Sequence, residues 1–469
     1  MIETKRIIKF GTDGWRARMA GDFTFQNVRK VAWALSQYLT ETNYKGSVLV
    51  GFDRRFYSNA FAREAAGTLS ALGIETYLSS HVLPTPALSY LAKQKRSYAV
   101  VVTASHNPPI DNGIKIKTPD GASAGKDITN RIEQIILRAP DDIEVKQIPT
   151  EPRLKSEYMT YLKEIAKPLR RKASKIKIII DYFHGSSLGL LEQVLDAKII
   201  ALRDKPDPYF GGTSPEPVEK NLDELKKTVR QKKALIGIAI DGDGDRIAMI
   251  DDQGRYITPT IVFPMYAYYH ALIAKEPGEI VQGVSLGYLA QRIASKANLP
   301  FKWVPVGFKH IAQRMLDANV LMGGEESGGY ALGRLVPDRD GIVNTLLILN
   351  ILLKTGLTPS KLIAKIFKDF GKSCFERYDF RLARPLDDAS TFLRTCEDGL
   401  VKRINTEHPA VKNKLTIDGL KLFFEDGSWL LIRPSGTEPL VRIYAETPSQ
   451  TETRKLLSTA ADWIKGASL

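Results

Sequence analysis

The sequence predicts an α/β protein of several domains, with a smaller α+β domain at the C-terminus. The length of 469 residues is enough for roughly two to four domains. Over most of the chain, strand-like runs alternate with helical patterns of about ten to fifteen residues. This alternation is typical of parallel or mixed sheets that are covered by helices on both faces.

The alternation of strand and helix occurs in three rounds. The expected strands are residues 47–52, 98–103, 176–181, 235–240, 279–284, 301–306 and 320–323. The expected helical segments are residues 58–72, 187–195 and 288–297. Each round therefore has the elements of one α/β module.

The last hundred residues have a different pattern, in which short strands are separated by turns. The expected strands are residues 374–382, 414–417, 421–425, 429–433 and 441–445, with Asp-Gly turns at Asp418 and Asp426 and a closing helix at 449–465. We therefore expect four domains, at residues 1–153, 154–255, 256–370 and 371–469, the last of them α+β.

Composition excludes several classes of protein. With 43% hydrophobic and 26% charged residues, the chain is neither disordered nor collagen-like. Cys374 and Cys396 are the two cysteines of the sequence, too few for a disulfide framework or a paired-CxxC zinc site. Because the N-terminal residues include charges where a secretory signal needs an apolar run, we expect a soluble, cytoplasmic protein.

The net charge is 67 − 53 = +14, which favours anionic partners. Nucleic acid, an anionic membrane surface and phosphorylated small molecules are all compatible with this charge. Nucleic acid is disfavoured because basic and aromatic residues are not interleaved as a stacking surface requires.

The most specific motif is Asp241-Gly242-Asp243-Gly244-Asp245-Arg246, directly after the expected strand 235–240. Three carboxylates at a spacing of two can bind a hard divalent cation, because the glycines let the backbone curl around it. An EF-hand loop begins similarly, but its sixth position requires Gly and its twelfth Glu, where this chain has Arg246 and Asp252. A plain acidic turn is disfavoured because the carboxylates would repel one another.

A second motif, Thr103-Ala104-Ser105-His106-Asn107-Pro108-Pro109, follows the strand at 98–103. A serine at the carboxyl end of such a strand exposes its hydroxyl at the edge where open α/β sheets bind ligands. By itself the motif is also compatible with an ordinary Asn-Pro turn. Lys115 adds a cation close in sequence.

Two further loops carry groups that can bind hydroxyl or phosphate oxygens. In the glycine-rich loop 323–329, Glu325 and Ser327 can hydrogen-bond a polyhydroxyl ligand, and the preceding Lys309 can exchange a proton if burial lowers its pKa, or be exposed. In the loop 433–439 and the strand that follows it, two guanidinium groups, two hydroxyls and a glycine turn can form a phosphate cradle that needs no nucleotide. The residues of this cradle are Arg433, Ser435, Gly436, Thr437 and Arg442.

Together with Phe10-Gly11-Thr12-Asp13-Gly14-Trp15-Arg16, these four motifs resemble the α-D-phosphohexomutase family. This family includes phosphoglucomutases, phosphomannomutases and phosphoglucosamine mutases. The resemblance spans nearly the whole chain, with Ala17 in place of the family's usual glycine. It implies three related α/β domains and one α+β domain arranged around a central cleft, each contributing one loop.

The resemblance also implies roles for individual residues. It implies that Ser105 carries a phosphoryl group, that Mg²⁺ binds to Asp241, Asp243, Asp245 and Ser105, that Glu325, Ser327 and His310 bind the sugar, and that Arg433, Ser435, Gly436, Thr437 and Arg442 bind the phosphate that is not transferred. The cations expected to offset the negative charge are Arg16, Lys115, Arg246 and Lys309. For the general base we expect Lys115 first and Lys309 second, followed by His106 and His310.

The implied reaction interconverts hexose 1-phosphates and hexose 6-phosphates through a hexose 1,6-bisphosphate. The expected cofactors are Mg²⁺ and glucose 1,6-bisphosphate, and the expected partners are hexose phosphates, with neither nucleic acid nor a membrane, for a monomer or homodimer. The loops around Lys309 and Glu325 resemble those of glucose and glucose/mannose enzymes, so we expect glucose first and mannose second. A phosphoglucosamine mutase, a hexose-1,6-bisphosphate synthase that releases the bisphosphate, and a metal-dependent phosphatase are the alternatives.

Overall fold

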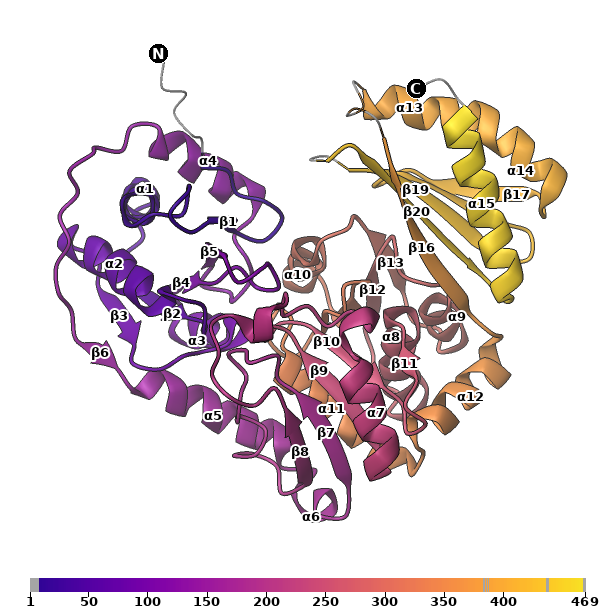
Figure 1. Cartoon of the computed structure of the whole chain (residues 1–469), viewed down its shortest axis with the longest axis horizontal. Helices are drawn as coiled ribbons and strands as arrows, with labels where there is room; N and C mark the ends of the chain where they lie inside the picture. The colour runs from indigo at the N-terminus through magenta and orange to yellow at the C-terminus, as the bar shows by residue number, and fades with distance from the viewer. Residues whose placement is uncertain (1–7, 383, 385, 387, 436–437, 467–469) are drawn as a thin grey trace. The chain divides into compact units, whose positions relative to one another are not determined.

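The computed structural model describes residues 8–382, 384, 386, 388–435 and 438–466. The chain forms two compact units, which are described one at a time. The first consists of residues 1–257, 312–318 and 327–360, and the second of residues 258–311, 319–326 and 361–469. The described strands form four sheets (Figure 1).

The first sheet is mixed and has the strand order β1-β5-β4-β2-β3-β6. Strands β2, β3 and β4 run parallel, whereas β5 is antiparallel to both β4 and β1. The elements are β1 (Trp15–Arg18), α1 (Phe25–Glu41), β2 (Val48–Phe52), α2 (Ser58–Ala71), β3 (Thr76–Ser79), α3 (Thr85–Lys95), β4 (Tyr98–Val102), β5 (Asp111–Lys117), α4 (Lys126–Ile136) and β6 (Thr150–Glu151).

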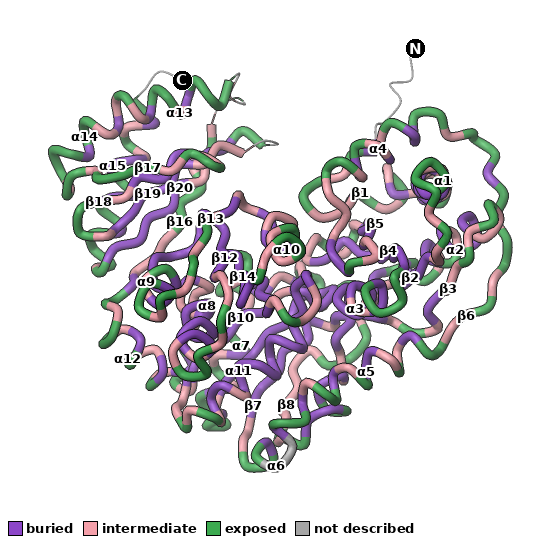
Figure 2. Tube along the Cα trace, turned by 180° about the vertical axis from the view of Figure 1, so that it is seen from behind, coloured by how far each residue is buried: buried purple, intermediate pink, exposed green. Residues whose placement is uncertain are grey.

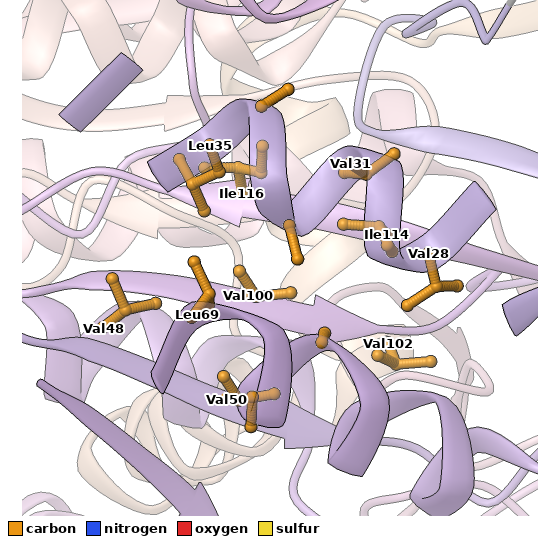
Figure 3. Packing of buried hydrophobic residues seen from close by; sticks show 14 of the residues in the cluster. Val28, Val31, Leu35, Val48, Val50, Leu69, Val100, Val102, Ile114 and Ile116 are labelled. Atoms are coloured by element: carbon orange, nitrogen blue, oxygen red, sulfur yellow. The ribbon is translucent and has the colours of Figure 1, made fainter. Parts of the chain in front are cut away.

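The core of this domain follows from two sequence periods. Apolar residues of α1 recur every three or four positions and share one helix face, while alternate residues of β2, β4 and β5 share one sheet face. Figure 3 shows that these two faces pack together. The labelled side chains are Val28, Val31, Leu35, Val48, Val50, Leu69, Val100, Val102, Ile114 and Ile116.

The second sheet is also mixed and has the order β11-β10-β9-β7-β8. Strand β7 is parallel to β8 and β9, and β9 turns back into the antiparallel β10. Both β9 and β10 are buried along their whole length, and the chain around the label of β10 is in the colour of buried residues in Figure 2. The elements are α5 (Arg153–Ala166), α6 (Arg170–Ala173), β7 (Lys177–Asp181), β8 (Lys198–Leu202), η1 (Phe210–Gly212), η2 (Glu219–Asn221), α7 (Asp223–Lys232), β9 (Ile236–Ile240), β10 (Ile247–Ile250) and β11 (Tyr256–Ile257).

The prediction of a helix at residues 187–195 is wrong. The chain there makes consecutive turns, in which the amide of Leu190 donates to the carbonyl of Ser187 and that of Val194 to Leu191. Gly189 has a φ of 76°, in the left-handed region, and therefore interrupts a regular helix. The apolar side chains of this segment are nevertheless buried. Their spacing in the sequence therefore resembles that of the buried face of a helix.

The third sheet has the order β13-β12-β14-β15, with β12 parallel to both β13 and β14. Its strands and the surrounding helices follow the expected alternation. The elements are α8 (Pro259–Ala267), η3 (Tyr268–Ile273), β12 (Glu279–Gly283), α9 (Leu289–Lys296), β13 (Phe301–Val304), α10 (Phe308–Asp317), β14 (Val320–Gly324), β15 (Tyr330–Leu332), α11 (Gly341–Thr355) and α12 (Pro359–Phe370).

The C-terminal domain is α+β, because all four strand pairs of its sheet, in the order β16-β20-β19-β18-β17, are antiparallel. Apolar residues of its helices and of the sheet form one core. The elements are β16 (Cys374–Arg381), α13 (Ala389–Thr395), η4 (Cys396–Leu400), α14 (Val401–Glu407), β17 (Val411–Leu415), β18 (Leu420–Phe424), β19 (Trp429–Pro434), β20 (Leu440–Thr447) and α15 (Gln450–Gly466). The predicted fold class is confirmed.

Among the helices of the described residues, none is by itself long and apolar enough to cross a bilayer. Helices α11 and α12, bent by 75° relative to each other, meet the length and composition criteria only as a pair.

Candidate active site

Ser105 lies in the loop after β4 and has an unusual backbone conformation. Its φ is 54°, in the left-handed region that non-glycine residues rarely adopt. Its amide donates to Thr103 Oγ1 at 2.8 Å, and its carbonyl accepts from Arg55 Nη2 at 2.7 Å. Thr103 in turn donates to Asp53 Oδ2 at 2.7 Å. Buried hydrogen bonds thus hold this serine in a conformation of the kind that clusters at functional sites.

The Ser105 hydroxyl lies 3.2 Å from Asp241 Oδ2 and 3.2 Å from His106 Nδ1. The sequence predicted an exposed hydroxyl, and this is wrong, because Ser105 is fully buried. The turn at 241–246 packs closely against it: a Cβ added at Gly242 would lie 2.6 Å from the Ser105 carbonyl oxygen. A reacting molecule can therefore reach this oxygen only after local movement.

The acidic motif forms the turn between β9 and β10. All three aspartates are buried, and their ligand atoms lie within 4.8 Å of one another. Asp241 Oδ1 accepts hydrogen bonds from the amides of Asp245 (2.9 Å) and Arg246 (3.1 Å), which shape the turn. Gly244 has a φ of 82°, and a Cβ there would lie 2.7 Å from Pro84 Cβ, so only glycine fits this position.

The donor atoms of this turn fit a hard divalent cation. The buried Oδ1 atoms of Asp243 and Asp245 have no hydrogen-bond partner among the described residues, and Asp241 Oδ2 faces the Ser105 hydroxyl. Burial, followed by the charges of Asp245 and Asp243, raises the pKa of Asp241 well above its ordinary value. A bound cation would offset this burial and repulsion, and carboxylate and hydroxyl oxygens are ligands that Mg²⁺ accepts.

Lys115, on β5, lies among these carboxylates. Its Nζ is 2.7 Å from Asp13 Oδ2, 2.8 Å from Asp243 Oδ2 and 2.9 Å from Asp245 Oδ2. Burial alone would lower the pKa of Lys115, but the three carboxylates outweigh burial and raise it. In this arrangement the positive charge of Lys115 offsets part of the negative charge of the three aspartates, and its role as a general base stays a prediction.

Two arginines and a histidine complete the surroundings of the hydroxyl. Arg16, on β1, donates from Nη1 to Asn107 Oδ1 at 2.8 Å, and Arg246 Nε lies 3.7 Å from Asp245 Oδ1. Burial, and then the charges of Arg246 and Arg16, lowers the pKa of His106 well below its ordinary value. His106 is therefore neutral beside the Ser105 hydroxyl and can act as a hydrogen-bond acceptor.

Asp13 and Arg339 also lie in this cluster, although no role for either was predicted from the sequence. Arg339 Nη2 is 2.7 Å from Asp13 Oδ2 and 2.8 Å from Asp245 Oδ2. The signal for Asp13 was its place in the N-terminal motif that carried the family resemblance. For Arg339, the signal was a charged triplet, Asp338-Arg339-Asp340, directly before the apolar run of α11.

Among the described residues of the sugar and distal-phosphate loops, six predicted ones belong to the second unit and Ser327 belongs to the first. Lys309 and His310 lie in the first turn of α10, and Glu325 is buried directly after β14. The other three, in the C-terminal domain, are Arg433, Ser435 and Arg442. Gly436 and Thr437 lie outside the described residues.

In the C-terminal domain, Arg433 and Arg442 are direct neighbours across β19 and β20. Arg433 Nε donates to Asp418 Oδ2 at 2.9 Å, and within the described residues no hydrogen bond from its Nη atoms is seen, so these atoms can donate to another acceptor. The same Asp418 oxygen accepts from the amide of Val306 at 2.9 Å, in the loop before Lys309. Asp418 therefore connects the strand that carries Arg433 to the loop that carries Lys309.

Family models match four successive parts of the chain. They are described as phosphoglucomutase/phosphomannomutase α/β/α domain I at residues 8–141, domain II at 156–254, domain III at 262–370 and the C-terminal domain at 396–462.

Two curated relatives match over nearly their full length. The phosphoglucosamine/phosphogalactosamine mutase of Sulfurisphaera tokodaii is 30% identical over 471 residues, covering 97% of this chain and 99% of the relative. The phosphoglucosamine mutase of Methylococcus capsulatus is 30% identical over 472 residues, covering 98% and 97%.

A crystal structure from Thermus thermophilus, provisionally described as a phosphomannomutase, superposes with a TM-score of 0.84 at 29% identity. The superposition covers 98% of this chain and 99% of that one. Both chains therefore share one fold over their whole length.

Proposed function

Because the chain belongs to the phosphoglucomutase/phosphomannomutase family and is thus an intramolecular phosphotransferase, we propose that it interconverts hexose 1- and 6-phosphates through a phosphoserine at Ser105. The observation that carries this proposal is the contact of 3.2 Å between the Ser105 hydroxyl and Asp241 of the acidic turn. It brings the acidic motif and the serine motif, 136 residues apart, to one place.

The transfer takes place in two balanced steps. In the first, a free hydroxyl of the hexose monophosphate attacks the phosphorus of phosphoserine 105, the bond from phosphorus to Ser105 Oγ breaks, and the sugar hydroxyl loses its proton to a base. The product is a hexose 1,6-bisphosphate. In the second, the Ser105 oxygen freed by the first step attacks the other phosphorus, the bond from that phosphorus to its sugar oxygen breaks, and this sugar oxygen takes the proton back from the base, which leaves the isomeric monophosphate and restores the enzyme.

Asp241, Asp243 and Asp245, together with Ser105, would hold Mg²⁺. When bound, Mg²⁺ acts as a Lewis acid that draws charge from the transferring phosphoryl group. The Oδ1 atoms of Asp243 and Asp245, which accept no hydrogen bond within the described part of the chain, support this assignment.

The charges near Ser105 support a site that holds one phosphoryl group on this serine. A phosphoserine carries about −2, and four ionised aspartates bring the total to about −6. Four basic side chains and one Mg²⁺ return the total to about zero. The aspartates are Asp13, Asp241, Asp243 and Asp245, and the basic residues are Lys115, Arg16, Arg246 and Arg339.

Since the cations near Ser105 are already matched, the second phosphate of the substrate needs its own. We assign this role to Arg433 and Arg442, with Ser435, Gly436 and Thr437, and the sugar hydroxyls to Glu325, Ser327 and His310. The adjacent guanidinium groups of Arg433 and Arg442 on β19 and β20 support the assignment. Lys309 stays a candidate for proton transfer.

For the sugar, we propose a hexosamine phosphate as the first candidate and glucose or mannose phosphate as the second. The names of the Sulfurisphaera and Methylococcus relatives favour the hexosamine, against our sequence-based preference for glucose. The loops around Lys309 and Glu325 and the Thermus structure favour the second candidate. One or two hydrogen bonds, worth about 1 kcal/mol each, separate such sugars.

A coupled assay tests this function. Purified protein with Mg²⁺ is supplied with glucosamine, glucose or mannose 1-phosphate, with and without the matching 1,6-bisphosphate, and kcat/KM is compared. We expect turnover that the bisphosphate stimulates, with the highest kcat/KM for glucosamine 1-phosphate. Negligible turnover of all three sugars would contradict the mutase function. Net release of bisphosphate would indicate the synthase, and release of inorganic phosphate at the rate of isomerisation would indicate the phosphatase.

A further inference from the structure

In the segment Asp338-Arg339-Asp340, just before α11, hydrogen bonds hold the aspartate on each side of Arg339. Asp338 Oδ2 accepts from Lys117 Nζ at 2.5 Å and from Ser89 Oγ at 2.6 Å. Asp340 Oδ1 accepts from the amide of Val343 at 2.9 Å and so caps α11. All three residues of the segment are buried, so the position of Arg339 between them is closely defined.

Arg339 extends from this segment to the outer side of the acidic turn. Its Nη2 lies between Asp13 Oδ2 and Asp245 Oδ2, the same two oxygens that Lys115 Nζ contacts. The two cations and two carboxylates alternate and form a closed ring of charges. Asp245 Oδ2 is therefore fully engaged, while Asp245 Oδ1 has no hydrogen-bond partner among the residues that the structure describes.

The same division holds for Asp243. Its Oδ2 accepts from Thr85 Oγ1 at 2.5 Å and from Lys115 Nζ at 2.8 Å, and its buried Oδ1 has no hydrogen-bond partner in the described chain. Since the two oxygens of a carboxylate move together about the Cβ–Cγ bond, fixing Oδ2 also fixes the direction of Oδ1. The groups that contact the Oδ2 atoms of Asp243 and Asp245 thus determine where the Oδ1 atoms of these residues point.

We propose that Arg339 is a positioning residue of the divalent-cation site, which orients the Asp245 carboxylate for the metal without contacting metal or substrate. This inference rests on the proposed function, because that function places Mg²⁺ at Asp241, Asp243 and Asp245. Removing a residue that hydrogen-bonds a metal ligand, without contacting the metal itself, typically weakens metal affinity 10- to 100-fold.

Arg339 also adds a positive charge, which by itself would weaken cation binding. Orientation and charge therefore predict opposite effects when Arg339 is replaced by a neutral residue. Lysine separates the two, because it keeps the charge but loses the planar, multi-donor guanidinium that bridges Asp13 and Asp245. We expect orientation to dominate in both variants.

The test is a calorimetric titration of the full-length, dephosphorylated protein with MnCl₂ and with MgCl₂. Variants Arg339→Met and Arg339→Lys are compared with wild type. Arg131→Met is the matched control, because Arg131 pairs with Glu41 at the surface, away from the site. Asp241→Asn shows whether the measured binding occurs at the acidic turn. Circular dichroism and thermal unfolding monitor the fold of each variant.

We expect a 10- to 100-fold weaker affinity in Arg339→Met, a loss at least as large in Arg339→Lys, which keeps the opposing charge, and none in Arg131→Met. In turnover, excess Mg²⁺ should restore kcat of Arg339→Lys, which a damaged fold would not allow. Affinity of Arg339→Lys within two-fold of wild type, or tighter binding by Arg339→Met, would overturn the inference and leave the proposed function intact. If Arg339→Met does not fold, Arg339→Lys decides alone. Wild type that binds no metal would overturn the metal assignment and this inference together.

Discussion

At the scale of residues, the chemistry depends on a small number of atoms around Ser105. Its hydroxyl contacts a carboxylate of the acidic turn and a neutral histidine. Each of these side chains comes from a motif that is recognisable in the sequence. Their contacts could not be predicted from sequence, because they depend on how β4 and the β9–β10 turn approach each other in space.

The phosphate-binding role of Arg433 gives a prediction at this scale. Arg433→Ala removes a charge-assisted contact worth about 1.5 to 3 kcal/mol, so KM should rise about 10- to 100-fold, with a smaller change in kcat. Steady-state kinetics with the best hexose 1-phosphate measures both constants. Arg454→Ala is the matched control, since Arg454 pairs with Glu376 at the surface. An unchanged KM in Arg433→Ala would remove this residue from the phosphate site.

At the scale of elements, the β9–β10 turn depends on a left-handed glycine. Gly244→Ala places a Cβ at a φ of 82° against Ser187 Oγ and Pro84 Cβ. Gly189→Ala is the matched control, because Gly189 has a φ of 76° and nothing in the described chain lies within 4 Å of its added Cβ. We expect a loss of about 1 kcal/mol for Gly189→Ala and an additional loss of about 1 to 3 kcal/mol for Gly244→Ala.

Urea unfolding monitored by circular dichroism measures both free energies. Metal affinity should fall only in Gly244→Ala, because this substitution distorts the acidic turn itself. Equal losses of stability in the two variants would show that crowding at Gly244 plays no part.

The cap of α11 gives a pH-dependent prediction. Burial raises the pKa of Asp340 to about 7, although the amide of Val343 and the Tyr158 hydroxyl, which donate to it, oppose this rise. The ordinary pKa is near 4, so between pH 4 and 7 the folded state keeps a proton that the unfolded state has lost. The contribution of Asp340 to stability is therefore greatest below pH 4 and is lost as the pH rises through 7.

Asp340→Asn removes this titration but keeps an oxygen that can cap the helix. The free energy of unfolding of the variant, relative to that of wild type, should increase as the pH rises from 4.5 to 7.5, by up to about 4 kcal/mol. Urea unfolding at the two pH values measures the difference. A difference in free energy of unfolding that is the same at both pH values would contradict the raised pKa.

Local patterns were sufficient for most elements and insufficient for others. The segment 187–195 has apolar spacing compatible with a helix, but Gly189 interrupts it. The helix expected at 58–72 is confirmed as α2, because its apolar residues and neighbouring strands agree. The buried environment of Ser105 was missed, because burial depends on contacts with Arg55 and Gly242, which are distant in sequence.

At the scale of the whole molecule, four domains with one set of chemical groups each account for the family match. The net charge of +14 fits anionic substrates but identifies none of them. Asp13 and Arg339 are 326 positions apart and contact each other. Arg339 also contacts Asp245, and Asp13 also contacts Lys115. Such a cluster is a property of the assembled chain, which explains why the sequence pattern indicated roles for Lys115 and Asp245 but none for Asp13 or Arg339. The monomeric or homodimeric state and the cytoplasmic location stay predictions.

The most direct measurement of the central claim is phosphate on the Ser105 peptide during turnover. Wild type and Ser105→Ala are incubated with Mg²⁺ and a ³²P-labelled hexose 1,6-bisphosphate, digested and analysed by mass spectrometry and by radioactivity. We predict one phosphoryl group on the wild-type peptide, which chases into hexose phosphate when unlabelled substrate is added, and no label and no mutase activity in a folded Ser105→Ala variant. An unlabelled wild-type peptide, with full activity in the alanine variant, would contradict the account.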